Sequence, residues 1–282
     1  MIHRPARPPV ESARARLRRW EVRPRRRLGQ CFLVDRRVSE RIAEAVGAGP
    51  GEPVIEIGAG TGELTECLLS RGARVWAVEL DRALAARLRG ELTATVVEAD
   101  ALETRFRDLV PEGPFVVTGN LPYYCTTDLL LHLLDQREGV SRAVFLVQRE
   151  YADRLASPPG RKAYGSIGVL VGYFAQVERL FRVGPAAFHP RPEVQSAAIR
   201  LTFRPGRGLP EARERALFRI VRRAFQQRRK QLRAALRELV PAGRERLLEA
   251  LARAGVDPAR RGETLSLEEF MALAEALEGE LA

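Results

Sequence analysis

An alternation of short apolar segments with helix-like segments constrains the fold more than any other feature of this sequence. Pro53–Ile57, Arg74–Glu79 and Thr95–Asp100 have the length and apolar content of buried strands. Helical patterns separate them at Glu63–Ser70 and Arg82–Gly90, and another helical pattern precedes them at Arg36–Val46. Strands that alternate with helices in this way pair in parallel, so the sequence predicts an α/β fold built on an open sheet.

The turn after the first of these strands is rich in glycine and follows an acid. Gly58-Ala59-Gly60-Thr61-Gly62 leads into the next helix, so its backbone can approach a ligand closely and the helix offers free N–H groups. A dinucleotide-binding fingerprint has a third glycine where Glu63 stands here. With Glu56 before the turn, this difference favours S-adenosylmethionine, whose ammonium needs acceptors, over a pyrophosphate.

Acids end the next two strands. Glu79 is placed to accept hydrogen bonds from both hydroxyls of a ribose, and Asp100 from an adenine amino group. Taken singly, each acid is more often a helix cap or a surface charge. Their shared position at consecutive strand ends favours a binding site, because open α/β sheets bind ligands at that edge.

A further apolar run, Phe115–Val117, leads into Asn120-Leu121-Pro122-Tyr123 and then a helix. Pro122 biases Leu121 towards an extended backbone, so the Asn120 side chain and the Leu121 carbonyl point the same way. Two acceptors beside the Tyr123 ring suit a planar base with an exocyclic amino group, and adenine is the candidate. Alone, these four residues are more often an ordinary turn.

A Pro-rich loop at 185–192 lies between expected strands at 172–182 and 194–203. It contains Phe188, which is a candidate to close the far face of a base stacked on Tyr123. A buried hydrophobic anchor is an equally good interpretation of Phe188.

The net charge of +11 and the pI near 10.6 point to a polyanionic partner. Residues 1–27 are rich in Arg and Pro without sustained periodicity, and we expect a disordered basic arm that is either a solvated tail or an RNA contact. A linker at 205–208 precedes a region that reads as helical throughout. Its expected helices are 211–225, 228–240, 244–254 and 267–281.

Within the helical region, Gln227–Arg233 is strongly basic. Its cations are candidates for contacts with RNA phosphates, although a solvated helix face has the same pattern. The candidate RNA-binding residues are Arg228, Arg229, Lys230 and Arg233.

With 282 residues, of which 45% are apolar, the chain can form a larger and a smaller domain. We expect the arm at 1–27, a catalytic domain at 28–204 and a helical RNA-binding domain at 205–282. No apolar run approaches the roughly 18 residues of a membrane span, and no signal-peptide core is present, so a cytoplasmic protein is expected. The cysteines and histidines are scattered without metal-ligand spacing, so no metal is expected.

The chain resembles the ribosomal RNA adenine dimethyltransferase family from about Leu28 onwards. The motifs that carry the resemblance are Leu28-Gly29-Gln30-x-Phe32-Leu33, Glu56–Gly62, Asn120–Tyr123, Ala163-Tyr164-Gly165, Phe188-x-Pro190-x-Pro192-x-Val194-x-Ser196 and Gln227–Arg233. Within the family it is similar to the small-subunit type, which dimethylates two adjacent adenosines in the 3′-terminal hairpin of 16S rRNA.

The resemblance implies a Rossmann-like methyltransferase with a mostly parallel seven-stranded sheet and a small all-helical C-terminal domain. It implies S-adenosylmethionine as cofactor, and a monomer that acts on 16S rRNA in immature small ribosomal subunits. The cofactor contacts that it implies are Cys31, Leu33, Gly58, Gly60, Glu79, Asp100 and Asn120. The catalytic positions that it implies are Asn120, Leu121, Pro122, Tyr123 and Phe188.

One position departs from the family pattern. The family usually has Asn where this chain has Cys31, so the resemblance leaves a backbone contact there in place of a side-chain contact near the methionine end of the cofactor.

Three other functions are weighed against this one. The first is the macrolide-resistance type of the same family, which methylates a single adenine of large-subunit rRNA; the Ala163-Tyr164-Gly165 segment, Gln148-x-Glu150 and the basic tract favour the small-subunit type. The second is a non-catalytic RNA-binding assembly factor, against which the intact acids and Asn120 argue. The third, an NAD-dependent dehydrogenase, does not fit the glycine spacing.

Overall fold

The computed structural model describes residues 11–25, 29–204 and 208–281, and these form two compact units. The first unit holds the described residues up to Arg149 together with Arg179–Leu201. The second holds Glu150–Glu178 and the described residues from Thr202 onwards. The predicted domains, 28–204 and 205–282, differ from this division because the segment Glu150–Glu178 belongs with the C-terminal helices. Most of the expected linker lies outside the described residues.

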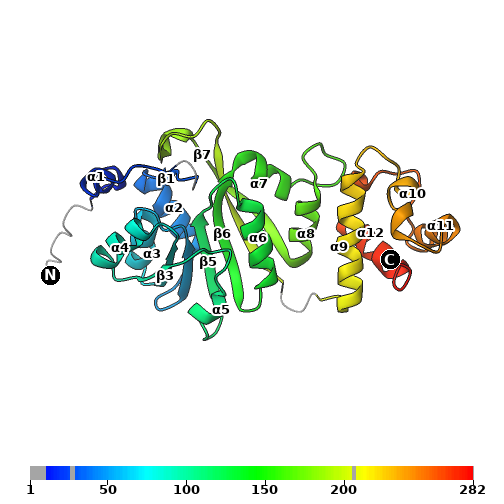
Figure 1. Cartoon of the computed structure of the whole chain (residues 1–282), viewed down its shortest axis with the longest axis horizontal. Coiled ribbons are helices and arrows are strands. Elements are labelled where there is room, and N and C mark those ends of the chain that lie inside the picture. Colours follow the sequence, from blue (N-terminus) through cyan, green and yellow to red (C-terminus); the bar gives the residue numbers. More distant parts are fainter. Residues whose placement is uncertain (1–10, 26–28, 205–207, 282) are drawn as a thin grey trace, which may run out of the picture. The chain divides into compact units, whose positions relative to one another are not determined.

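A seven-stranded sheet forms the framework of the α/β part (Figure 1). Its strands, in spatial order, are β4 (Thr95–Glu98), β3 (Arg74–Glu79), β2 (Pro53–Ile57), β5 (Phe115–Asn120), β6 (Val140–Gln148), β9 (Ser196–Phe203) and β7 (Ala175–Val183). The strands from β4 to β6 pair in parallel. The predicted α/β fold with a mostly parallel seven-stranded sheet is confirmed.

The chain order places a switch point between two central strands. From β2 the chain moves outwards to β3 and β4, and then returns to place β5 on the other side of β2. The connections that leave β2 and β5 therefore diverge at their carboxyl ends, and a crevice is expected between them. Gly119 allows the two strands to approach closely there, because a Cβ at that position would lie 2.3 Å from the Ile57 carbonyl oxygen.

The helices of the first unit begin and end where local chemistry dictates. Asp35 and Asp81 accept hydrogen bonds from the first turns of α2 and α4, and Gly47 ends α2 in the left-handed conformation. These helices are α2 (Arg36–Val46), α3 (Glu63–Ser70), α4 (Arg82–Glu91), α5 (Phe106–Leu109) and α6 (Thr126–Asp135). The sequence pattern predicted α2, α3 and most of α4 with the same bounds.

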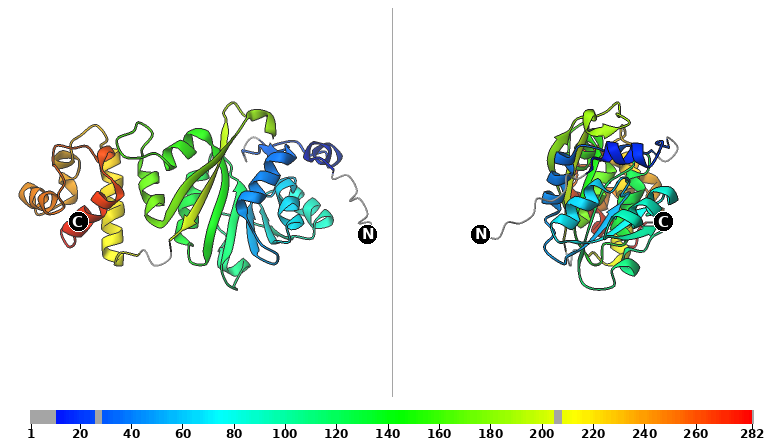
Figure 2. Two further views of the ribbon diagram at one scale, coloured as in Figure 1. Left: turned by 180° about the vertical axis from the view of Figure 1, so that it is seen from behind. Right: turned by 90° about the vertical axis from the view of Figure 1, so that its left-hand side faces the viewer.

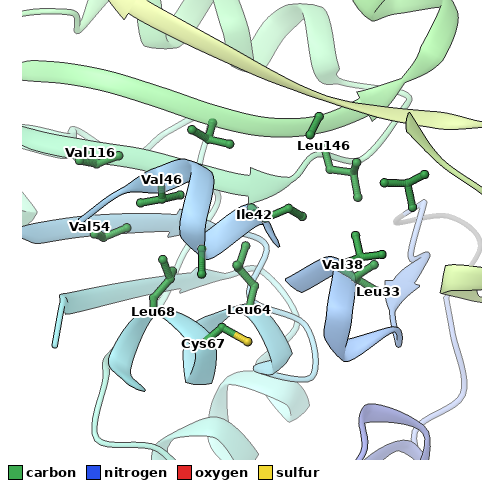
Figure 3. Packing of buried hydrophobic residues seen from close by; sticks show 14 of the residues in the cluster. Leu33, Val38, Ile42, Val46, Val54, Leu64, Cys67, Leu68, Val116 and Leu146 are labelled. Atoms are coloured by element: carbon green, nitrogen blue, oxygen red, sulfur yellow. The ribbon is translucent and has the colours of Figure 1, made fainter. Parts of the chain in front are cut away.

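The apolar faces of α2 and α3 pack against the sheet (Figure 3). Val38, Ile42 and Val46 lie on one face of α2, as the helical spacing requires. They meet Val54 of β2 and Val116 of β5 in one buried cluster. Val54 and Val116 lie near the starts of β2 and β5, so this core holds in place the two strands whose carboxyl ends carry the candidate site.

The N-terminal region contains a helix, α1 (Ala13–Arg19), so the predicted disordered arm is wrong for residues 11–25 (Figure 2). Ser12 caps α1 by accepting from the Ala15 N–H. Leu17 and Trp20 are each 5% exposed, within a cluster of buried residues that includes Leu84 and Leu88 of α4. Burial of these two side chains against α4 orders this segment, and the Arg-rich composition gave no sign of that burial. The rest of the expected arm lies outside the described residues.

The second unit is mainly helical, and helices were predicted for most of its residues from 211 onwards. Its elements include α8 (Ser166–Phe174), α9 (Glu211–Gln226), α10 (Leu232–Ala235), the 3-10 helices η3 (Arg237–Leu239) and η4 (Gly262–Thr264), α11 (Arg244–Arg253) and α12 (Leu267–Ala276). It also includes α7 (Arg149–Leu155) except for Arg149, which belongs to the first unit. α8 was missed, because no element was predicted for its start and its end was predicted as part of a strand at 172–182. Its Tyr173 and Phe174 pack edge to face on Phe218 of α9. The strand β7 begins directly after α8.

The predicted helix at 228–240 is also wrong. Gln231 forms an isolated antiparallel bridge with Arg261. The N–H groups of Leu232 and Arg233 donate to the carbonyls of Arg260 and Pro258 instead of continuing α9. The segment is therefore a turn followed by the short α10 and η3. No helix in the described part of the chain is both long and apolar enough to cross a bilayer.

Candidate active site

A pocket opens at the switch point between β2 and β5, at the carboxyl ends of the central strands. Its cavity volume is about 1140 Å³, including space open to solvent. It is lined by residues 29–33, 56–61, 63–64, 78–80, 99–102, 120–125 and 129. Every residue that the sequence predicts for cofactor binding lines it, from Cys31 to Asn120. Leu121, Pro122 and Tyr123 line it as well, so the two predicted half-sites share one cavity.

The glycine-rich turn and Glu79 are held together by hydrogen bonds. The Gly60 N–H donates to Glu79 Oε2 over 2.8 Å, and the Asp81 N–H donates to Oε1 over 2.9 Å. Gly60 has a φ of +57°, and a Cβ there would lie 3.1 Å from the Phe32 ring, so glycine is required. Glu79 is 6% exposed, and burial raises its pKa, although these N–H groups oppose the rise.

Two further acids face the pocket from the same edge. Glu56 is 2% exposed and accepts from the Thr65 hydroxyl over 2.6 Å. Burial raises the pKa of Glu56 to about 8, and nearby Glu79 adds to the rise. Burial also raises the pKa of Glu63, against the lowering effect of Arg36. A cationic ligand in this pocket would stabilise the ionised forms of these carboxyl groups and so lower their pKa values.

Asp100 lines the pocket beyond β4. Its Oδ1 accepts from the Leu102 N–H over 2.9 Å, which fixes the side chain at the turn. Leu80, directly after Glu79, is 45% exposed and adds apolar surface to the pocket lining. One wall of the pocket therefore offers acids that suit an ammonium and a ribose, an acceptor that suits an amino group, and an apolar surface that suits a ring. This donor and acceptor set fits S-adenosylmethionine.

Asn120 has a defined amide orientation. Its Nδ2 donates to the Cys31 carbonyl over 2.8 Å, and a carbonyl can only accept, so Oδ1 remains to accept from a ligand. This bond uses the backbone carbonyl of Cys31 and is made within the protein, so the contact of Cys31 with the cofactor stays a prediction. The Cys31 Sγ lies 3.2 Å from the Pro190 carbonyl, and burial raises the pKa of this thiol to about 11.

The residues after Asn120 are fixed by the strand and helix on either side. The Leu121 N–H donates to the Leu146 carbonyl over 3.1 Å, and the Leu121 side chain is 1% exposed. The Pro122 carbonyl accepts from the Thr126 hydroxyl over 2.9 Å at the start of α6. The Tyr123 hydroxyl lies 2.7 Å from Ser196 Oγ on β9. The ring of Tyr123 is thus tethered at its far end while it lines the pocket.

Phe188 does not line the pocket. It begins β8 (Phe188–His189), which pairs with β1 (Phe32–Leu33), and lies opposite Leu33, directly after the 3-10 helix η2 (Pro185–Ala187). Phe188 is 1% exposed and belongs to the hydrophobic cluster around α2. A ring buried in this way cannot stack on a base, so in this structure Phe188 is the hydrophobic anchor that the sequence allowed as the other interpretation.

Sequence reasoning missed two residues of the site. Tyr124 lines the pocket and is 61% exposed, with its ring against Gly29. Ser196 belongs to one of the sequence motifs, but no role was predicted for it; in the structure it forms a hydrogen bond with the Tyr123 hydroxyl. An aromatic directly after Tyr123 was a signal for the first. Nothing in the sequence pairs the second with Tyr123.

The predicted RNA-binding tract lies in the second unit, in the turn after α9. Arg228 forms an ion pair with Glu263 and donates to the Lys162 carbonyl over 2.8 Å. Arg229 and Lys230 are exposed, and their side chains make no hydrogen bond or ion pair within the described ranges. Arg233 is exposed and donates to Gln231 Oε1 over 2.9 Å. The four candidates therefore divide into Arg228, which holds the turn, and the others, which face solvent.

Comparison with known proteins bears on this geometry. The model of a family described as ribosomal RNA adenine dimethylase matches residues 22–278. A ribosomal RNA small subunit methyltransferase A from Desulfitobacterium hafniense (strain DSM 10664 / DCB-2) is 45% identical over 253 residues, which cover 89% of this chain and 91% of the relative. A protein of the same name from Anaeromyxobacter sp. (strain K) is 46% identical over 279 residues, covering 94% of this chain and 98% of the relative.

Solved structures share the fold. The structure of the 23S rRNA methyltransferase ErmE is 30% identical and superposes with a TM-score of 0.68, covering 87% of this chain and 99% of its own. A dimethyladenosine transferase from Plasmodium falciparum superposes with a TM-score of 0.76 over 89% of this chain and 99% of its own. At 24% identity, the second likeness concerns the fold alone.

Proposed function

The chain belongs to the ribosomal RNA adenine dimethylase family, and from this premise we propose that it dimethylates two adjacent adenosines in the 3′-terminal hairpin of small-subunit (16S) rRNA, with S-adenosylmethionine as methyl donor. The observation that carries the proposal is the orientation of Asn120, whose Oδ1 is left to accept beside Tyr123 in the pocket that holds the acidic wall. Relatives named small subunit methyltransferase A, at 45% and 46% identity, support the choice of subunit.

The target amine needs geometric help, because its lone pair is delocalised into the adenine ring. Asn120 Oδ1 and the Leu121 carbonyl accept its two hydrogens, draw it towards tetrahedral geometry and aim its lone pair. The Tyr123 ring stacks on the base and is held by Ser196. The bound cofactor supplies an electrophilic methyl group on a sulfonium. The methylated amine is acidic enough to lose its proton to water, and one hydrogen remains for a second cycle.

The acidic wall binds and orients the cofactor. Glu79 accepts from the ribose hydroxyls through lone pairs that the Gly60 and Asp81 N–H groups leave free. Glu56 and the glycine turn lie at the methionine end, where a carboxylate attracts the ammonium. Asp100 accepts from the adenine amino group. Positioning and charge complementarity therefore account for the cofactor side without a metal ion in the mechanism.

The partner that we propose is 16S rRNA in immature small subunits, bound by a monomer in the cytoplasm. The net charge of +11 supports a polyanionic partner. The exposed Arg229, Lys230 and Arg233 are the proposed phosphate contacts, since a flipped adenine fills the pocket but does not distinguish one rRNA from another.

A second candidate is methylation of a single adenine in large-subunit rRNA, which the likeness to ErmE at 30% identity favours. The deciding experiment uses tritiated S-adenosylmethionine with separately purified, unmethylated small and large subunits, followed by nucleoside analysis. We expect dimethyladenosine from the small subunit, with two methyl groups on each of two adjacent adenosines. Label in one adenosine of large-subunit RNA would favour the second candidate. Transfer to neither would favour a non-catalytic assembly factor.

The RNA contacts are tested by salt titration of binding to small-subunit particles. Replacing Arg229 and Lys230 with Ala should lower the log–log salt slope by about 1.5 units, because each lost phosphate contact removes roughly 0.7–0.9. Arg228→Ala is the matched comparison: its ion pair with Glu263 predicts lower stability of the second unit with a smaller change of slope. An unaltered slope in the double variant would return the tract to a solvated surface.

A further inference from the structure

The N-terminal segment at residues 11–25 attaches to the two turns that carry the proposed cofactor contacts. Arg16 of α1 is 4% exposed, which is unusual for an arginine. Its Nη1 donates to the Thr61 carbonyl over 2.8 Å, and its Nη2 pairs with Glu66 of α3. Thr61 lies between Gly60 and Gly62 and lines the pocket. A buried guanidinium is therefore bonded to the backbone of the glycine-rich turn.

A second contact reaches the start of α3. The Ala13 N–H donates to Glu63 Oε2 over 3.0 Å, while Arg36 of α2 donates to Glu63 Oε1 over 3.2 Å. Arg36 also donates to Glu66 Oε2 over 2.9 Å. Glu63 is 3% exposed and lines the pocket. The N-terminal segment thus completes a charge network next to the turn, in which the buried Glu63 has N–H and cationic partners and the partly exposed Glu66 has two cationic partners.

The segment is also fixed at its far end. The Trp20 Nε1–H donates to Glu91 over 2.8 Å, and Arg19 contacts both oxygens of Glu91 over 2.6 and 2.8 Å. Arg25 lies 3.3 Å from the carboxylate of Asp81. The Asp81 N–H in turn holds Glu79. One short segment therefore links the turn after β2 to the turn after β3.

We propose that residues 11–25 form a brace that holds the glycine-rich turn in its cofactor-binding shape, with Arg16 as the positioning residue. Gly58, Gly60 and Gly62 all have positive φ, and such a turn has many other conformations available to it. Ordering the turn before the cofactor arrives removes part of the entropy cost of binding. The brace rests on the proposed function for the identity of the cofactor, and it acts on affinity without touching the reacting atoms.

The test compares Arg16→Ala with Arg14→Ala and Arg18→Ala, which remove exposed arginines from the same helix and so match the change in charge. Affinity is measured by calorimetry with S-adenosylmethionine and with S-adenosylhomocysteine, and methyl transfer is measured on small-subunit particles. For Arg16→Ala we expect Kd and KM for the cofactor to rise roughly tenfold, with kcat at saturating cofactor near that of the wild type. The matched variants should bind as the wild type does.

A general loss of stability is separated by Val46→Ala, which weakens the buried cluster around α2 at a position that does not line the pocket. It should lower Tm without raising the cofactor KM. Unchanged affinity in Arg16→Ala, an equal rise of KM in Val46→Ala, or a fall in kcat at unchanged KM would each overturn the brace. If the wild-type protein binds neither ligand, it is the proposed function that fails.

Discussion

The cofactor half of the pocket, which comprises Glu56, Gly60, Glu79 and Asp100, and the base half, which runs from Asn120 to Tyr124, differ in how their polar atoms are satisfied. In the cofactor half each carboxyl already accepts a hydrogen bond from the protein. Glu56 and Glu79 are almost fully buried, so their hydrogen bonds contribute to the stability of the fold as well as to the binding site. Changes there should cost both stability and binding.

The base half carries its chemistry on a few side chains. Asn120 uses its amide N–H on Cys31 and keeps its oxygen for the ligand, and Tyr124 is 61% exposed. The backbone beneath them is fixed by the bond from the Leu121 N–H to the Leu146 carbonyl and by the Thr126 hydroxyl, which donates to the Pro122 carbonyl. Changes in this half should therefore lower the rate while the fold persists. Stability and turnover can therefore be separated within one cavity.

The largest expected effect, and the sharpest test of this separation, is Asn120→Ala. Loss of one acceptor that is aimed at the developing charge should lower kcat by about 10²–10³-fold. Because Asn120 is partly exposed and its side chain makes one hydrogen bond within the described residues, to the Cys31 carbonyl, Tm should stay close to that of the wild type. Single-turnover methyl transfer and thermal unfolding measure the two quantities. A large fall in Tm with a normal rate would reverse the roles of the two halves.

Glu79→Ala is the counterpart in the cofactor half. It removes the ribose acceptor and leaves the Gly60 and Asp81 N–H groups without their partner. We expect cofactor affinity to fall by roughly tenfold to a hundredfold, corresponding to about 1.4–2.7 kcal/mol, with a lower Tm and RNA binding nearly intact. Calorimetry and unfolding are measured on the same preparation. Unchanged affinity would remove Glu79 from the site.

Tyr123 and Phe188 test the boundary of the base half. Loss of a stacked base is worth about 1–3 kcal/mol, so Tyr123→Ala should lower kcat/KM by roughly tenfold to a hundredfold. Tyr123→Phe keeps the ring, loses the Ser196 bond and should cost less. Phe188→Ala should instead lower stability by about 3–5 kcal/mol, because it empties a buried site. A rate loss in a folded Phe188→Ala protein would restore Phe188 to the stack.

The sequence predicted the elements from Arg36 to Glu79 with their bounds, because their apolar spacing is regular and glycines or aspartates mark their ends. It did not predict α1, α8 or the turn after α9, since contacts with distant segments decide them. Glu79 and Asp100 followed from the rule that ligands bind at strand ends, and Asn120 followed from the motif Asn120–Tyr123. Their partners did not, because the Asn120 to Cys31 bond spans 89 residues and the Tyr123 to Ser196 bond spans 73.

The smallest expected effect concerns Glu56, whose pKa is raised by burial from 4.5 to about 8. Between these values the folded protein keeps a proton that the unfolded chain has released, so the contribution to stability is full below pH 4.5 and is lost as the pH rises through about 8. Without cofactor, the Tm of the wild type should therefore fall between about pH 6 and about pH 8 more steeply than that of Glu56→Gln, which stays neutral. Between about pH 6 and about pH 8 this loss amounts to roughly 1.7 units, or about 2.3 kcal/mol at 1.4 kcal/mol per unit. Because each kcal/mol moves Tm by about 2–4 °C, the difference should be about 5–9 °C. Glu79 titrates in both proteins, so the variant keeps part of the slope of Tm against pH.

Saturating cofactor should flatten the wild-type curve as well, because an ammonium beside Glu56 favours the ionised carboxylate. Parallel curves for the two proteins would show that Glu56 is not the buried acid that titrates.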